Sequence, residues 1–395
     1  MGNRTGLFTN TIIWFGVAIS VSEIQAGVQI ASAAPINSIW VPLILGHLIG
    51  GLLLFLVGLI GADLRVNAME SVQPTFGNLG SKFFATLNVM QLVAWVAVLN
   101  AQGTMALMGL NLPISFPVTC FILAIFVAIW VFIGLERSSK ATSVIMIILT
   151  VLLIALSAKI IGMQLYPAVQ LTAPELNFWN IFEISIAMPV SWLPVISDYT
   201  KDVKEPKKAT ALSAIGYTIA SLWMYFIGVG VVGVGTTDIS QAILIAGLGI
   251  PGVLILALST VTTNFLATNS AGESAKAIYN RLNPKTTGVV VSILSALIAI
   301  SGIMDHYISF LYLITSVFAP MAAVLIVSYY LGDGNNNSRD WYWNLGSWFV
   351  GFIVYQIVVN LDSIVLGPTL IAVIVSAALA YIRILIKKNI KTQSR

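Results

Sequence analysis

The sequence predicts an all-α membrane protein with twelve transmembrane helices, on the basis of its composition and the spacing of its apolar runs. Hydrophobic residues make up 58% of the 395 residues and charged residues only 9%, far from the composition of soluble proteins. Apolar runs long enough to cross about 30 Å of hydrocarbon recur along the chain. These runs cover residues 11–34, 39–62, 83–107, 113–134, 142–162, 178–199, 209–234, 242–270, 287–303, 307–330, 342–361 and 365–386.

The distribution of basic residues predicts the orientation of these helices. Eighteen of the nineteen Lys and Arg residues lie near the termini or in every second gap between the runs, and Lys159 is the exception. Because cytoplasmic loops are enriched in Lys and Arg, both termini are expected in the cytoplasm. The expected location is the plasma membrane of a bacterial or archaeal cell. The same loop bias explains the formal net charge of +4, so no nucleic acid is expected as a partner.

The runs divide into two halves of nearly equal length followed by a short remainder. Residues 11–162 and 178–330 each contain five runs, and residues 342–386 contain two more. With five helices per half, the halves enter the membrane from opposite sides, which is the geometry of an inverted repeat. In such folds the first helix of each half is interrupted near the membrane midplane, at the substrate and ion sites. We expect residues 1–395 to form one polytopic domain.

The first run is polar at its centre. Ser20, Ser22, Glu23, Gln25 and Gly27 stand where leucine and isoleucine would be expected. A carboxylate near the bilayer centre is costly, and it usually faces a cavity on a substrate, ion or proton path. The alternative is an acid that bonds neighbouring helices for packing. We therefore expect an interruption here, with Glu23 as a functional residue.

The sixth run carries two prolines, Pro189 and Pro194. Each lacks an amide donor and crowds the carbonyl one turn back, which opens a helix locally; a simple kink is the alternative. Freed backbone groups at membrane depth are tolerated where they line a cavity or bind a ligand. We expect residues 190–193 to be unwound, with Ser191 and Trp192 on the substrate path.

Further polar residues lie within the third and eighth runs. Gln91 and Trp95 are four residues apart, so they share one helical face. An aromatic plane beside an amide suits a flat heterocycle, which needs stacking and edge hydrogen bonds. Asn264 and Asn269 lie in the eighth run. For each of these residues an interhelical hydrogen bond is the alternative.

Three other residues are expected to have structural roles or none. His47 is expected to pack between helices, and Cys120 to fill a small buried site. Glu183 is expected near an outer helix end, where solvent would surround it.

The residue inventory excludes several functional classes. The chain has two histidines, and no nucleophile–base pair or zinc motif is visible, so we do not expect an enzyme or a bound cofactor. A channel would favour a repeated filter loop, which is not visible either. No phosphate-binding Gly-x-x-x-x-Gly-Lys loop is present to power transport by ATP. A secondary active transporter remains.

Three strings of residues resemble the nucleobase–cation symporter-1 family. They are the interrupted run from Phe15 to Gly27, Ser197-Asp198-Tyr199-Thr200-Lys201 at the end of the sixth run, and Thr262-Thr263-Asn264 in the eighth. The strings at residues 15–27 and 189–200 look most like the hydroxymethylpyrimidine permease branch, which is related to cytosine permease. The resemblance covers nearly the whole chain.

The resemblance implies a LeuT-like fold with two five-helix inverted repeats plus two C-terminal helices, and a substrate site between helices one, three, six and eight. It also implies a sodium site, and neutral oxygen ligands do suit a monovalent cation. The candidate substrate-binding residues are Glu23, Gln25, Gln91, Trp95, Ser191, Trp192, Asn264 and Asn269. The candidate sodium ligands are the carbonyls of Ile19, Ser22 and Ser259 and the hydroxyls of Thr262 and Thr263.

The predicted function is import of a pyrimidine-type heterocycle by cation symport with alternating access. Hydroxymethylpyrimidine, a related thiamine precursor and cytosine are the candidate substrates. A purine, allantoin or hydantoin-type ring, and coupling to protons through Glu23 rather than to sodium, are the alternatives; the oligomeric state is left open. A protonated Glu23 would offer one donor and one acceptor to the edge of a 4-aminopyrimidine, which predicts a preference over 4-oxo rings.

Overall fold

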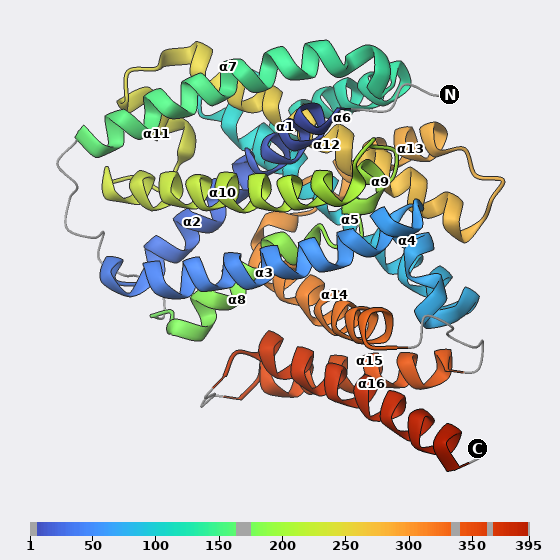
Figure 1. Ribbon diagram of the computed structural model, residues 1–395. Coiled ribbons are helices and arrows are strands. Elements are labelled where there is room, and N and C mark those ends of the chain that lie inside the picture. Colours follow the sequence, from blue (N-terminus) through green and yellow to red (C-terminus); the bar gives the residue numbers. More distant parts are fainter. Residues whose placement is uncertain (1–5, 163–174, 333–339, 362–365, 394–395) are drawn as a thin grey trace.

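The computed structural model describes residues 6–162, 175–332, 340–361 and 366–393, and every regular element in these ranges is helical. Figure 1 shows the helices as one bundle in which most run roughly parallel or antiparallel. Their bounds are α1 (Leu7–Ala18), α2 (Val21–Ala33), α3 (Ile36–Leu64), α4 (Ala68–Ser71), α5 (Gln73–Met108), α6 (Phe116–Ile133), α7 (Leu135–Gly162), α8 (Phe178–Ser191), α9 (Ile196–Thr200), α10 (Pro206–Gly233), α11 (Ile239–Ile245), α12 (Gly249–Ile278), α13 (Pro284–Ile300), the 3₁₀ helix η1 (Ile303–His306), α14 (Tyr307–Tyr330), α15 (Trp341–Val358) and α16 (Pro368–Gln393).

Nine segments of the described chain are helical, long and apolar enough to cross a membrane, so the protein is an integral membrane protein. Three expected runs do not meet the same criterion. The run at 178–199 is split between α8 and α9, and α13 has only 17 residues. The third is α15, in which aromatic and polar residues replace many aliphatic ones.

Basic residues gather at one end of the bundle. Arg65 Nη1 donates to the carbonyls of Lys201 (3.1 Å) and Val203 (2.6 Å), and Lys207 pairs with Asp63 at 3.2 Å. We call this end the basic end. Helices α4 and α9 lie on this side, whereas α11 lies on the other side (Figure 1).

The first expected interruption is present. α1 ends at Ala18 and α2 begins at Val21, so residues 19 and 20 separate two helical halves. Ser20 is the N-cap of α2, and its hydroxyl oxygen accepts a hydrogen bond from the Glu23 amide at 3.4 Å. A side chain thus replaces part of the lost backbone hydrogen bonding.

The second interruption is also present, but it lies two residues later than expected. Residues 192–195 form turns, whereas Val190 and Ser191 belong to α8 and Pro189 is inside it. The expected unwound segment at 190–193 was therefore wrong in its position. Pro194 determines the break, because a proline disfavours helical geometry at the preceding residue and has no amide to donate.

The helices pack in related pairs. α3 packs along α8, and α10 packs along α1 and α2. α5 packs along α12, and α6 along α13. Each broken helix therefore lies beside the second long helix of the other half of the chain.

The expectation for Glu183 was wrong. Its side chain is only 2% exposed and lies under the start of α16 rather than in solvent. One carboxylate oxygen accepts the Thr369 amide at 3.0 Å, and the other accepts the Thr369 hydroxyl and the Tyr355 hydroxyl, the latter at 3.3 Å. Through these hydrogen bonds Glu183 joins α8 to α15 and to the N-terminus of α16.

We expect Glu183→Ala to destabilise the protein by about 2–4 kcal/mol, because the buried Thr369 amide and Tyr355 hydroxyl both lose their acceptor. A lower melting temperature in detergent would report this loss. Asp305→Ala, which removes an exposed carboxylate, is the matched control and should melt like the parent protein. Equal melting temperatures for the two variants would contradict the role of Glu183.

Candidate functional site

Two amide side chains of α5 donate hydrogen bonds to backbone carbonyls at the break between α8 and α9. Gln91 Nε2 donates to the Ser191 carbonyl at 3.0 Å and to Asn88 Oδ1 at 2.8 Å. Asn88 Nδ2 in turn donates to the Pro194 carbonyl at 3.0 Å and to the Ser274 hydroxyl at 2.8 Å. These contacts hold freed carbonyls of the break. They also set the orientation of the Gln91 amide, whose Oε1 faces away from these partners as an acceptor.

Aromatic side chains surround the two helix breaks. Trp192, within the second break, packs edge-on against Trp14 of α1 with ring centroids 5.9 Å apart. Trp14 also meets Tyr199 of α9 and Tyr217 of α10, each at 6.2 Å. The Trp14–Trp192 contact therefore links α1 to the second break. Trp14 is fully buried and Trp192 is almost fully buried.

Trp95 of α5 lies against the start of α14. Its ring packs on Phe310 at 5.2 Å and on Tyr307 at 6.4 Å. The Tyr307 hydroxyl donates to the Ser22 carbonyl at 2.9 Å, at the start of α2. Helix α14 thus connects the Trp95 ring to the first break.

Five buried polar atoms on the helices that contact these breaks or each other have no hydrogen-bond partner. Within the described chain eight buried side-chain nitrogen or oxygen atoms are unpaired. Five of them lie on α1, α5 and α12, which contact one another or the breaks, and we call these five the central cluster: Trp14 Nε1, Gln91 Oε1, Trp95 Nε1, Thr263 Oγ1 and Asn264 Oδ1. An unpaired buried polar atom costs roughly 1–3 kcal/mol, so such a concentration calls for a ligand.

The central cluster has a defined hydrogen-bonding character. The two indole nitrogens are donors only, and the two amide oxygens are acceptors. The Thr263 hydroxyl can donate and accept. This set suits a small planar ring that carries both donors and acceptors on its edges, held among aromatic side chains.

The candidate sodium ligands lie at the first break and on α12, and α1 and α12 are in contact. Ile19 is the C-cap of α1, where the helical hydrogen-bonding pattern ends. The Thr262 hydroxyl donates to the Ser259 carbonyl at 2.8 Å, while Thr263 Oγ1 is unpaired. All of these residues are buried. Neutral carbonyl and hydroxyl oxygens form a candidate site for a monovalent cation.

Three predicted substrate residues contact other parts of the fold. The Glu23 carboxylate faces α10, where Tyr217 and Ser221 donate to its two oxygens at 2.6 and 2.8 Å. Asn269 is half-buried beside Tyr199. Gln25 lines a separate pocket. From the predicted set, the structure brings Gln91 into contact with Ser191, next to Trp192, while Trp95 lies one turn along α5 from Gln91 and Asn264 lies on α12, which packs along α5.

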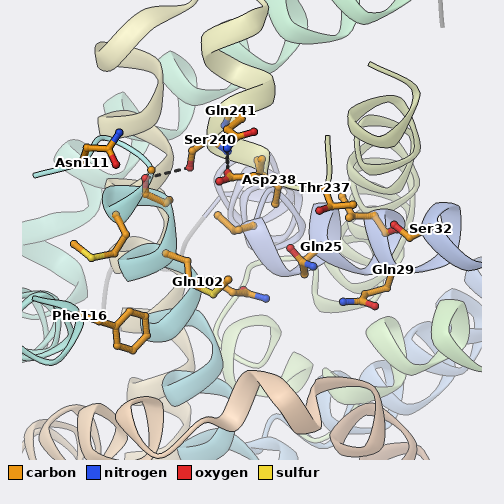
Figure 2. A pocket seen from close by; sticks show the side chains of 17 residues that line it. Gln25, Gln29, Ser32, Gln102, Asn111, Phe116, Thr237, Asp238, Ser240 and Gln241 are labelled. Atoms are coloured by element: carbon orange, nitrogen blue, oxygen red, sulfur yellow. Dashed lines mark hydrogen bonds between the residues drawn. The ribbon is translucent and has the colours of Figure 1, made fainter. Parts of the chain in front are cut away.

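A pocket of about 750 Å³ opens between α2, α5 and α11, at the end of the bundle opposite the basic end. Figure 2 shows Gln25 and Gln29 of α2 around the same space as Gln102 of α5 and Asp238. Gln102 Oε1 accepts the Ser22 hydroxyl at 2.5 Å, so the pocket reaches the helix next to the first break.

Trp14, Tyr217 and Tyr307 were not predicted from the sequence as residues of this region, and Gln102 was not among the predicted substrate-binding residues. Gln102 was visible as a polar residue within an apolar run, and its position could have indicated a role. Trp14, Tyr217 and Tyr307 carried no such signal, because aromatic residues are ordinary constituents of membrane helices.

Broken helices that surround a buried polar cluster define a class of membrane protein, the secondary transporters. The chain belongs to the family described as permeases for cytosine and purines, uracil, thiamine and allantoin, whose sequence profile matches residues 2–344. This family falls within the nucleobase–cation symporter-1 transporters. Its members are permeases, so the protein is a transporter and not an enzyme.

Individual relatives are distant. Cytosine permease of Escherichia coli (strain K12) is 20% identical over 341 residues, which cover 82% of this chain and 78% of that protein. Mhp1, a nucleobase–cation symporter-1 transporter solved in a closed conformation with bromovinylhydantoin bound, is 19% identical with a TM-score of 0.77, over 96% of this chain and 92% of that chain. A Na⁺-coupled sialic acid symporter in an outward-open state is 16% identical with a TM-score of 0.69, over 98% and 90%. These structures show the shared fold.

We expect Trp95→Phe to weaken substrate binding about tenfold, because it removes one hydrogen-bond donor while keeping an aromatic ring. The same change should leave thermal stability unchanged or slightly higher, because the donor has no partner in the protein. Isothermal titration and thermal unfolding measure the two quantities.

Trp348→Phe is the matched control, because Trp348 Nε1 donates to the Val317 carbonyl at 2.8 Å. This variant should lose stability and keep binding. If Trp95→Phe instead lost stability and kept substrate binding, the Trp95 indole would have a packing role only.

Proposed function

We propose that the protein imports a pyrimidine-type heterocycle by sodium symport with alternating access. Hydroxymethylpyrimidine, a related thiamine precursor and cytosine are the proposed substrates. The observation that carries the proposal is the central cluster, where two unpaired acceptors and two unpaired indole donors surround the helix breaks. An aminopyrimidine offers amine donors and ring-nitrogen acceptors on a flat ring, which complements this set.

A second substrate class follows from the relatives. The family description includes purines, uracil and allantoin, and Mhp1 was solved with a hydantoin bound. These rings also carry donors and acceptors on a planar frame. Uptake of a labelled panel of aminopyrimidines, oxopyrimidines, purines and hydantoins into proteoliposomes separates the classes, and aminopyrimidines should compete best.

Sodium is the proposed coupling ion. The unpaired Thr263 hydroxyl supports this proposal, as does the placement of Thr262 and Ser259 beside it on α12. The similarity of fold to a Na⁺-coupled symporter points the same way. Ile19 and Ser22 would supply carbonyl oxygens from the first break.

We also propose the twelve-helix arrangement with two inverted repeats and cytoplasmic termini. Its support is the paired packing, in which α3 meets α8 as α10 meets α1 and α2. The two breaks occupy corresponding places in the halves at 11–162 and 178–330, and α15 and α16 form the additional pair. The basic end would face the cytoplasm.

Replacing Thr262 and Thr263 together with valine should abolish the stimulation of uptake by sodium, because two hydroxyl ligands are lost while side-chain shape is kept. Initial uptake rates with and without a sodium gradient measure the effect. Thr260→Val is the control: its hydroxyl donates to the Ala257 carbonyl at 2.7 Å, as that of Thr262 does to Ser259 at 2.8 Å, but Thr260 is not a candidate ligand. Sodium stimulation that survives in the double variant would refute the assignment.

Cysteine labelling tests the orientation, because Cys120 is the only cysteine and is buried. Thr237→Cys, at the end opposite the basic end, should react with an impermeant maleimide in intact cells. Lys208→Cys, at the basic end, should react only after the membrane is opened. Both positions are exposed in the fold, so the opposite labelling pattern would show the reverse orientation.

A further inference from the structure

The pocket between α2, α5 and α11 contains a buried hydrogen-bond donor that is not part of the central cluster. Gln102 lines this pocket and is only 2% exposed. Its Oε1 accepts the Ser22 hydroxyl at 2.5 Å, which sets the orientation of the amide, and its Nε2 has no hydrogen-bond partner. Figure 2 shows the Gln102 side chain extending from α5 towards Gln25 and Gln29 of α2. A buried amide nitrogen without an acceptor is costly, and an acceptor on a ligand would remove that cost.

The wall of the pocket is rich in amides and poor in charge. Gln25 and Gln29 are four residues apart, so they share one face of α2, and Asn111 and Gln241 add two further amides. Each amide offers an acceptor oxygen and two N–H donors. Among the described residues that line the pocket, Asp238 is the only charged one, and its Oδ1 accepts two backbone amides at the start of α11. An anionic ligand would meet no cation here, so the wall suits an uncharged polar ligand.

Apolar side chains cover the space between the amides. They include Val21, Val28, Met105 and Phe116. The volume of about 750 Å³ lies within the range of small-molecule sites, which is roughly 300–1,000 Å³. Apolar walls with a few directed polar groups are typical of sites that bind a ring by its faces and orient it by its edges.

The pocket and the central cluster lie at different levels of the same face of α5. Gln102 follows Gln91 by eleven residues and Trp95 by seven, and whole turns of the helix fit both intervals closely. At a rise of 1.5 Å per residue, about 16 Å along the helix separate Gln91 from Gln102. A single six-membered ring with its substituents is too short to pair with both amides. A ligand on Gln102 is therefore a second ligand, distinct from one in the central cluster.

We propose that this pocket is a second binding site, for an uncharged nitrogen heterocycle of the transported class, with Gln102 Nε2 as its buried donor. The identity of the ligand rests on the proposed function. The pocket lies at the end opposite the basic end, which faces the external medium in the proposed orientation. A ring arriving for import would therefore bind here at the outer side, and Gln25 would contact it rather than the ring in the central cluster.

This second site binds more weakly than the central cluster. Gln29, Asn111 and Gln241 are exposed, so water can replace the ligand as their hydrogen-bond partner. The unpaired polar atoms of the central cluster are all buried. Two classes of site with different affinities are therefore expected in one chain.

Gln102 also connects the pocket to the first break. The Ser22 hydroxyl donates to its Oε1, and the Ser22 carbonyl accepts from Tyr307 of α14. An amide whose Nε2 is held by a ligand keeps its Oε1 turned to Ser22. A ring in the pocket would thus stabilise the contact between α5 and the start of α2.

Equilibrium binding of radiolabelled cytosine to the purified full-length protein tests the proposal. The parent should bind two molecules per chain, one tightly and one weakly. Gln102→Met keeps the length of the side chain and removes the donor, so it should lose the weak site and keep the tight one. Trp95→Phe should weaken the tight site about tenfold and leave the weak site unchanged. Retained binding at one site shows in each case that the variant is folded.

Two further variants separate loss of the site from a change at the first break. Gln102→Met also removes the acceptor of Ser22, whereas Gln29→Trp fills the pocket from an exposed position and leaves Gln102 intact. Gln29→Trp should also lose the weak site. Asn100→Leu is the matched control: Asn100 is a buried amide of α5 with an unpaired oxygen, but it donates to the Cys120 carbonyl of α6 at 3.1 Å and does not line the pocket. This variant should keep both sites.

Protection of an introduced cysteine locates the weak site. Gln241→Cys, which is exposed and lines the pocket, should react more slowly with a maleimide when cytosine occupies the weak site. Ser115→Cys, which is exposed but does not line the pocket, should react at the same rate with and without cytosine. Adding Gln102→Met should abolish the protection of Gln241→Cys.

The outcomes separate this proposal from the proposed function. One cytosine per chain in the parent, or a weak site that survives both Gln102→Met and Gln29→Trp, would overturn the second site and leave the proposed function standing. Protection of Gln241→Cys without any tight binding would support the second site and count against the proposed function. Absence of both binding and protection with cytosine and with hydroxymethylpyrimidine would overturn both.

Discussion

Hydrocarbon offers no hydrogen-bond partner to a peptide group, and this constraint governs the arrangement around both helix breaks. Side chains pair with the freed groups: Ser20 caps α2, Asn88 and Gln91 donate to carbonyls of the second break, and Tyr307 donates to the Ser22 carbonyl. Eight buried side-chain atoms of the described residues remain unpaired, and five of them form the central cluster. The proposed binding region is thus made of polar atoms that this pairing leaves without a partner.

Helix α2 presents different chemistry to different neighbours. Ser22 contacts Gln102 on α5 and Tyr307 on α14, on the side of the pocket and the central cluster. The next residue, Glu23, contacts Tyr217 and Ser221 on α10. Successive residues of a helix point about 100° apart, so one short segment contacts α5 and α14 through Ser22 and α10 through Glu23. A movement of α2 would change both together.

The sequence predicted what depends on local chemistry and failed where distant packing decides. The polar residues around Glu23 predicted the first break, and the prolines at 189 and 194 predicted the second. The second break was placed too early because Pro189 lies inside α8 and does not end it. The face shared by Gln91 and Trp95 followed from helical spacing. The partners of Glu23 lie 194 and 198 residues away on α10, and those of Glu183 lie on helices at the end of the chain, so no local pattern could reveal them.

A cryo-electron microscopy structure with sodium and either cytosine or hydroxymethylpyrimidine would show where the substrate binds. We expect a planar ligand among Trp14, Trp95 and Trp192, with its edges paired to Gln91 Oε1 and Asn264 Oδ1. We also expect Glu23 to keep its contacts with Tyr217 and Ser221. A ligand paired to the Glu23 carboxylate, or one bound in the 750 Å³ pocket with the central cluster still unpaired, would contradict the proposed binding region.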